Sequence, residues 1–502
     1  MTRKSTRAIA AVFALLAVCL SGSLLAGQSL DKMKAQIQEK TLANGMKFIV
    51  MEQHEAPVAS FHVYADVGSA QEVNGITGIS HILEHMAFKG TTTVGTKDYA
   101  AEAKVLAELD QVYGQLSREE ARIKPDAKRV QELKTRFDEL QKQAKGYVVN
   151  NEYFDLVMEQ GDTGVNAYTS SDATQYLNSL PANKLEFWMA ITSDRFLNPV
   201  FREFYKERDV IMEERRLGLE TQPIGKLIED FIAVAFKAHP YHHEVVGHMS
   251  DLQRIRHQDV KEYFKKYYSP SNLTAAIVGD VDANEVFRLA EMYFGRIPSG
   301  PRPEPLRTRE PEQWGERKAT VTAQSQPVLI IGYHRPDVRH ADTAALDALA
   351  NILGQGRSSR LWESLVKKEK VAAQVQGFSG FPGDKYPCLI LFFAVPSKDK
   401  TAAQSLELME KEIARIKQEP VTPQELAKYK QMSKKALIGQ LKSNARLAAQ
   451  LTAYDAVQGD WRLLFDELAN IDKITAADIQ RVANTYLVTT NRTVGEIVPE
   501  KK

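Results

Sequence analysis

The second half of this 502-residue chain repeats a pattern found in the first half. Residues of like chemistry recur 219 positions apart, as Asp259 and Asp478 do. The pairs are Leu252 with Ile471, Ile255 with Ile474, Asp259 with Asp478, Val260 with Ile479, Tyr267 with Tyr486, Asn272 with Asn491, Thr274 with Thr493, and Val278 with Ile497. This constant register indicates two duplicated halves rather than a short-period solenoid.

Each half is predicted to contain a strand that precedes a helix. In the first half, alternating apolar residues predict a strand over 60–67, then a glycine-containing loop and a helix that ends near Gly90. In the second half, the same order is expected as a strand over 328–333 and a helix over 341–353. Other expected elements are strands over 47–51, 174–180 and ending at 277–280, and helices over 185–196 and 204–219.

A proline-rich segment separates the two halves. Residues 296–315 contain five prolines, which exclude a helix or a central strand and are typical of a semi-stiff linker. We therefore place one domain at 35–295 and the other at 316–500. Residues 97–146 carry apolar side chains at helical spacing with a break at Pro125, which predicts a helical hairpin inserted in the first domain. We interpret it as a structural insertion rather than as an arm that grips a partner or substrate.

The composition is that of a globular protein with more than one domain. Apolar residues make up 43% of the chain and charged residues 26%, and 502 residues suffice for two cores. The formal net charge of +1 gives no reason to expect nucleic acid or an anionic membrane surface as a partner.

The N-terminus has the pattern of a secretory signal. Arg3, Lys4 and Arg7 precede an almost wholly apolar run over 8–25, so residues 1–26 are predicted to be a signal peptide and the protein to be exported, to the periplasm. The alternative is an uncleaved membrane anchor. Cleavage would leave Cys388 as the one cysteine, which excludes an internal disulfide. Its apolar neighbours favour a buried, unreactive thiol.

The sequence Gly78-Ile-Ser-His-Ile-Leu-Glu-His-Met86 carries the clearest chemical signal. His81 and His85 are four residues apart and therefore lie on one face of a helix, one turn apart. Imidazole is a good zinc ligand, and Glu84 stands beside the second histidine where it can take a proton from water. This is the H-x-x-E-H arrangement.

A third ligand must come from elsewhere in the first half. Residues 207–214 are rich in glutamate, and Glu207 and Glu214 are seven residues apart, two turns along one helix face. One of the two can bind the metal while the other supports a ligand from behind.

Taken together, these motifs closely resemble those of the pitrilysin family, most of all its bacterial and mitochondrial-processing-peptidase branch. The resemblance extends over almost all of residues 38–500. It depends on Gly78–Gly90, Asn166–Thr169, Glu207–Glu214, His239–Tyr241, Tyr267–Asn272 and Ser358–Leu361.

The resemblance implies a zinc endopeptidase of α+β fold. Each half would be a mainly antiparallel sheet covered by helices on one face. One Zn²⁺ would be held by His81, His85 and Glu214, with Glu84 as general base and Glu207 in support. A peptide substrate would add as a strand along Asn166, Ala167, Tyr168 and Thr169.

One departure from the family concerns an arginine and a tyrosine that active members usually carry in a second-half domain. The corresponding positions hold Val366 and Ala373, whose side chains donate no hydrogen bond. We therefore expect a heterodimer in which a homologous subunit without zinc supplies the Arg/Tyr pair. The alternatives are a non-catalytic scaffold and a partner-dependent processing subunit.

Overall fold

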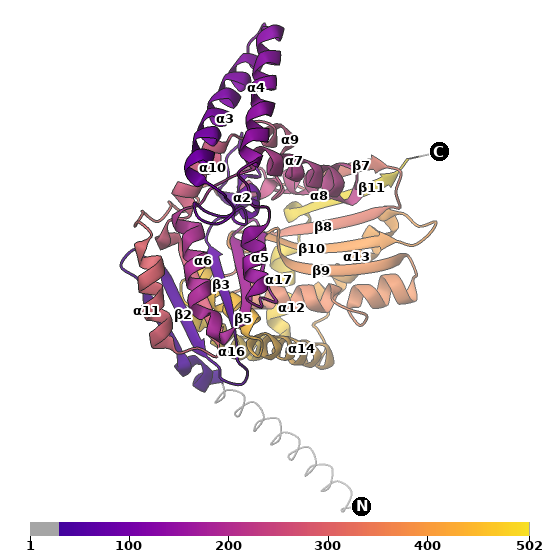
Figure 1. The fold of residues 1–502 in the computed structure, drawn as a ribbon. Coiled ribbons are helices and arrows are strands. Elements are labelled where there is room, and N and C mark those ends of the chain that lie inside the picture. Colours follow the sequence, from indigo (N-terminus) through magenta and orange to yellow (C-terminus); the bar gives the residue numbers. More distant parts are fainter. Residues whose placement is uncertain (1–29, 501–502) are drawn as a thin grey trace, which may run out of the picture.

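The computed structural model describes residues 30–500 and contains two β-sheets, one from each half of the chain (Figure 1). The predicted signal peptide at 1–26 lies outside the described residues. Between residues 30 and 500, no helix combines the length and the apolar character needed to cross a membrane.

The first sheet has six strands in the order β1-β2-β6-β3-β5-β4. Only β2 and β6 run parallel, and the other neighbours are antiparallel. The strands are β1 (Ile37–Thr41), β2 (Lys47–Glu52), β3 (Val58–Ala65), β4 (Asn166–Thr169), β5 (Thr174–Pro181) and β6 (Leu273–Gly279). The short β4 therefore forms one free edge of this sheet.

The second sheet repeats the first without its outermost β1. Its order is β7-β11-β8-β10-β9, and β7 with β11 is again the parallel pair. The strands are β7 (Arg317–Ala323), β8 (Val328–Arg335), β9 (Ala372–Phe381), β10 (Cys388–Pro396) and β11 (Arg492–Pro499). The α+β fold class and the duplication are thus confirmed.

The helices of each half cover one face of that half's sheet and close a core against it. Those of the first half are α2 (Ile79–Met86), α5 (Glu152–Glu159), α6 (Leu185–Leu197), α7 (Phe204–Arg215), α9 (Met249–Leu252), α10 (His257–Tyr267) and α11 (Ala283–Tyr293). Those of the second are α12 (Thr343–Gly354), α13 (Ala402–Gln418), α14 (Pro423–Leu441) and α17 (Ala476–Tyr486), whereas α16 (Glu467–Lys473) contributes Leu468 to the cluster on the other face of the first sheet.

The other face of each sheet is covered by a helix from the opposite half, which the sequence did not predict. Helix α8 (Pro223–Ala235) packs on the second sheet, where the Phe231 ring lies so close to Gly332 and Gly495 that a Cβ on either glycine would come within 2.9 Å of it. Helix α15 (Asn444–Ala453) packs on the first sheet. Each sheet is therefore covered in part by a helix of the other half. The division of the chain into two domains at 296–315 remains a prediction.

Two long helices, α3 (Tyr99–Glu120) and α4 (Ala127–Lys145), form the expected hairpin and project away from the sheets (Figure 1). Asp98 and Asp126 cap their N-termini with side-chain hydrogen bonds to backbone N–H groups. At the base, the buried Arg202 guanidinium pairs with the buried Glu102 carboxylate at 2.9 Å. The hairpin is therefore rigidly joined to the body.

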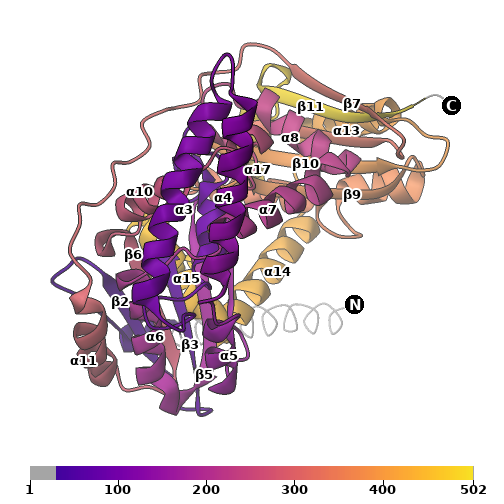
Figure 2. The same ribbon diagram turned by 45° about the horizontal axis from the view of Figure 1, so that its top comes forward.

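The proline-rich segment contains no helix or strand over residues 297–316 and runs along one side of the molecule from α11 to β7 (Figure 2). One predicted helix end was wrong. The helix after the first loop ends at Met86, not near Gly90, because Arg202 binds the carbonyl oxygens of Lys89, Thr91 and Val94 and fixes a turn there. Helix α7 ends at Arg215, and a π-helical turn, η3 (Arg216–Glu220), follows it.

Candidate metal centre

Helix α2 is held at its N-terminus by a buried carboxylate. Glu72 accepts hydrogen bonds from the backbone N–H groups of Gly78 at 2.7 Å and Ser80 at 2.8 Å. These donors have no partner within the helix, so Glu72 satisfies them. Burial raises the pKa of Glu72 to about 8 despite these two bonds. The helix is thereby fixed with His81 and His85 on its accessible side, both partly exposed.

The structure brings His81, His85 and Glu214 together. Glu214 Oε2 lies 3.7 Å from His81 Nε2 and 3.9 Å from His85 Nε2. One ligand atom from each residue lies within 4.8 Å of the other two. Zinc–ligand bonds of about 2.1 Å place tetrahedral ligands about 3.4 Å apart, so the three groups fit a zinc ion after a small contraction. Glu214 is 43% exposed, which leaves an open side for a further ligand.

The two histidines differ in their surroundings. Burial, with a smaller contribution from His85, lowers the pKa of His81 to about 4, so this ring is neutral at pH 7 and can bind metal. Burial also acts on His85, but the Glu207, Glu214 and Glu84 carboxylates outweigh it and raise the pKa of His85.

Glu207 supports His85 from behind, where the sequence placed it. Its Oε2 lies 3.5 Å from His85 Nδ1, and its Oε1 lies 2.5 Å from Lys89 Nζ. Burial opposes ionisation, yet His85 and Lys89 together lower the pKa of Glu207 to about 2. Sequence reasoning missed Lys89, although its position four residues after His85 was a usable signal.

Glu84 points into the same pocket as the ligand cluster. Burial raises the pKa of Glu84, and the neighbouring Thr169 and His85 only partly offset this effect. A raised pKa suits a group that must accept and then return a proton near neutrality.

The pocket is an open cavity of about 430 Å³. Its lining residues all belong to the first half: His81, Glu84, Tyr168, Thr169, Glu214, Gly218, Leu219, Glu244, Val245 and Val246. Tyr168 and Thr169 reach it from the edge strand β4, whereas Asn166 and Ala167 lie on β4 without lining it. Glu244, which sequence reasoning also missed, is a further carboxylate whose pKa burial raises.

The second half has a polar pocket at the matching place on its sheet. On α12, Asp347, Ala350 and Asn351 have the spacing of His81, Glu84 and His85, and all three line this pocket. The Arg335 side chain lines it and donates a hydrogen bond to the Asp347 carboxylate at 2.9 Å. The expected Arg/Tyr positions lie elsewhere, since Val366 packs against the second core and neither it nor Ala373 lines the metal pocket.

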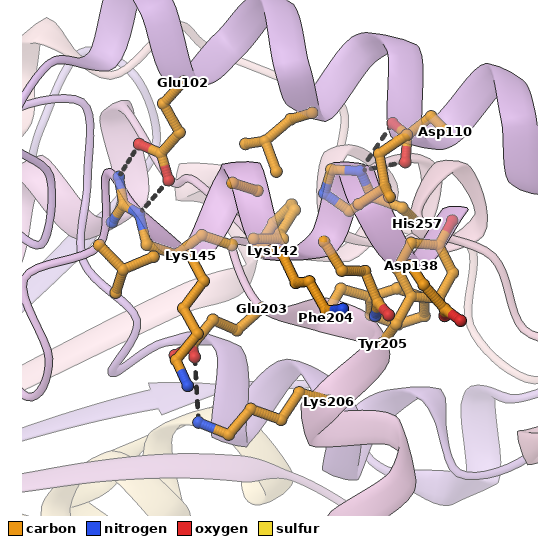
Figure 3. Close-up of a pocket in the computed structure, with 17 residues that line it drawn as sticks. Glu102, Asp110, Asp138, Lys142, Lys145, Glu203, Phe204, Tyr205, Lys206 and His257 are labelled. Carbon is orange, nitrogen blue, oxygen red and sulfur yellow. Dashed lines mark hydrogen bonds and ion pairs between the residues drawn. The ribbon is translucent and has the colours of Figure 1, made fainter. Parts of the chain in front are cut away.

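A second cavity, of about 320 Å³, lies at the base of the hairpin on the N-terminal side of α7 (Figure 3). Its wall is mainly apolar, and several of its polar groups pair with one another: His257 with Asp110 at 2.8 Å, Lys206 with Glu203 at 3.0 Å, and Arg202 with Glu102 at 2.9 Å. The histidine is committed to the aspartate, and no group of three metal ligands converges there among the described residues. The cavity therefore does not compete with the α2 pocket as a catalytic centre.

Two family models match the chain. The model described as "Insulinase (Peptidase family M16)" matches residues 47–120, which include His81, Glu84 and His85. The model described as "Peptidase M16 inactive domain" matches residues 254–433, most of which belong to the second half. Glu207 and Glu214 lie between the two matches.

Similar proteins and structures share nearly the whole length of the chain. A zinc protease of Helicobacter pylori, PqqE, is 29% identical over 99% of this chain and 100% of its own length. An uncharacterized zinc protease of Bacillus subtilis is 22% identical over 89% and 94%. The crystal structure of a protease from Helicobacter pylori has a TM-score of 0.77 at 28% identity and covers 92% of this chain and 99% of that one. A peptidase M16 inactive domain structure from Pseudomonas fluorescens has a TM-score of 0.72 at 17% identity, with coverages of 93% and 98%.

Proposed function

The chain belongs to the M16 family of peptidases, and we propose that it is a zinc-dependent endopeptidase that hydrolyses short or unfolded polypeptides. The convergence of His81, His85 and Glu214 beside Glu84 carries this proposal. Zinc bound there would lower the pKa of water and polarise the substrate carbonyl. The protein's own residues then have three tasks: to hold the ion, to move a proton and to position the peptide.

Proton transfer is the role of Glu84. Its carboxylate takes a proton from the attacking water and returns it to the leaving amine as the peptide bond breaks. Burial raises the pKa of Glu84 and so favours the protonated acid, while Thr169 and His85 favour the carboxylate. Glu207 keeps the His85 ring oriented through Nδ1 and is itself held by Lys89.

Strand β4 is the proposed docking edge for substrate. It is the outermost strand of the first sheet, and its Tyr168 and Thr169 reach the metal pocket. An extended peptide paired with β4 would gain main-chain hydrogen bonds that do not depend on sequence. This arrangement favours unfolded substrates because most strands of a folded protein are already paired within their own sheets.

We further propose that the chain is the zinc subunit of a heterodimer. Every residue that lines the metal pocket comes from the first half, and none is an arginine. A homologous subunit without zinc would supply the Arg/Tyr pair that stabilises the developing oxyanion. The chain should therefore cleave peptides slowly alone and at least about 100-fold faster with that subunit. Full activity of the chain alone would contradict the heterodimer.

Zinc analysis of the purified chain separates the enzyme from a non-catalytic scaffold. We expect one zinc ion per chain and cleavage that stops on chelation and returns when zinc is restored. A chain that binds no zinc and cleaves nothing with any partner would be a scaffold, and the proposed function would be wrong. Export to the periplasm is part of the proposal and is tested by locating the mature protein after cell fractionation.

A further inference from the structure

An apolar groove lies between α8 of the first half and the strands β9 and β10 of the second. It has a volume of about 300 Å³, and every lining residue is apolar except Gln376. Ile224 and Ile228 line it from α8, and Phe378, Phe381 and Phe393 line it from the strands. No charged side chain borders it.

The groove exists because α8 covers only part of the second sheet. The helix packs on β7, β11 and β8, where Phe231 is fully buried, and leaves the β10–β9 side of this face open. As a result Ile224, Ile228 and Phe393 remain half-buried, and Phe378 is 42% exposed. Apolar side chains gathered on an open face favour a partner that removes them from water.

The groove adjoins the metal pocket through the turn that connects α7 with α8. Gly218 and Leu219 of η3 line the metal pocket. The first turn of α8 packs directly on them, since a Cβ on Gly225 would lie 2.3 Å from Gly218 O and 2.8 Å from Leu219 Cα. Ile224 precedes this glycine and lines the groove. The η3–α8 junction therefore borders the metal pocket on one side and the groove on the other.

We propose that this groove is a substrate subsite that selects one large apolar side chain of the unfolded polypeptide, a few residues from the bond that is cut. This inference rests on the proposed peptidase function and adds a sequence preference to it. The occupant is substrate because residues 218–224 border the metal pocket at one end and the groove at the other, and because β9, beside the groove, is an edge strand of the second sheet. A charged residue is disfavoured because the groove offers it no partner once water is lost.

The preference can be measured without turnover. The full-length protein carrying Glu84→Gln is titrated with dye-labelled short peptides of polar sequence in which one leucine is moved along the peptide and compared with serine at the same position. We expect leucine to tighten binding about tenfold at one position and not at others. Ile228→Asn should abolish that advantage, and Phe378→Ser should reduce it.

Met292→Asn is the matched control, since Met292 is similarly exposed but lies on α11, in the first half. It should keep the full leucine advantage. The inference is overturned if no leucine position binds more tightly than serine, or if the advantage survives both Ile228→Asn and Phe378→Ser. Binding that prefers leucine in a protein that never cleaves would refute the peptidase function alone, whereas cleavage without the preference would refute the subsite alone.

Discussion

Helices α2 and α12 occupy the same place in the two sheets, yet only α2 collects metal ligands. In the second half, the carboxylate of Asp347 is neutralised by the protein itself, because the buried Arg335 donates to it at 2.9 Å. In the first half, the only basic side chains within 4 Å of the Glu214 carboxylate among residues 30–500 are the imidazoles of His81 and His85. His81 is neutral at pH 7 because its pKa is lowered to about 4.

The difference shows that the fold supplies the place and a few side chains decide its chemistry. The second half places the guanidinium of Arg335 in its pocket, so the Asp347 carboxylate there has a positive partner without a metal ion. The other half places the Glu214 carboxylate beside two imidazoles, and among residues 30–500 no lysine or arginine pairs with it, so no protein cation competes there with a metal ion from solution.

Glu84→Gln should lower the rate of peptide cleavage by about 10²–10⁴-fold, because the amide cannot accept the proton of the attacking water. Zinc content, measured on the same sample, should not change, since Glu84 is not a ligand. Asn351→Ala, at the corresponding position to His85 on α12, is the control and should leave cleavage intact. Undiminished turnover in Glu84→Gln would exclude the general-base role.

Glu207→Gln should weaken zinc binding by about 10–100-fold, because His85 loses the carboxylate that orients its ring. Competition with a chromophoric chelator gives the affinity. Glu213→Gln, on the same helix but paired with Arg216 at 2.9 Å, should bind zinc as tightly as the wild type. Equal affinities of the two variants would show that Glu207 does not support the site.

Arg335→Met should lower the free energy of unfolding by about 1–3 kcal/mol, since the buried guanidinium loses its bonds to Asp347 and Thr343. Asp347 is half-exposed and can be hydrated, which limits the loss. Urea unfolding gives the stability, and the zinc content should remain at the wild-type level. Loss of zinc from this variant would mean that the two pockets are not independent.

The fifth residues of β3 and β8 offer a smaller contrast between the halves. Gly332 of β8 makes room for Phe231, whereas His62 of β3 is buried and shares a 2.8 Å hydrogen bond between its Nδ1 and Thr452 Oγ1 of α15. Burial lowers the pKa of His62 to about 3.

This lowered pKa predicts a loss of stability in acid. The unfolded chain binds a proton on His62 near pH 6.5 and the folded chain does not, so the contribution is present above pH 6.5 and is lost as the pH falls toward 3. From pH 6.5 to 5.5 the wild type should lose about 1 kcal/mol more than His62→Asn. Parallel pH profiles of urea unfolding for the two proteins would contradict the assignment.

Much of this architecture was predictable because it leaves local or periodic signals. The 219-residue register predicted the duplication, and the His81–His85 spacing predicted which helix would carry the ligands. Apolar periodicity likewise predicted α3 and α4.

Other features leave no such signal. The exchange of α8 and α15 between the halves depends on tertiary packing, since an apolar helix face does not say which sheet it will meet. The end of α2 at Met86 depends on Arg202, which lies 111 residues in sequence from Thr91 in the turn that it fixes. The position of Glu244 in the metal pocket also depends on tertiary packing. Glu244 lies in a loop, and a loop has no sequence periodicity from which its position could be predicted.

The number of metal ions that the chain binds, and the half that binds them, can be measured. Elemental analysis of the purified full-length protein should find one zinc per chain. His85→Ala and Glu214→Gln should each lose most of it, while Asp347→Asn and Asn351→Ala on α12 should retain it. Zinc that persists in both first-half variants, or that disappears from the α12 variants, would contradict the claim that the first half alone holds the metal.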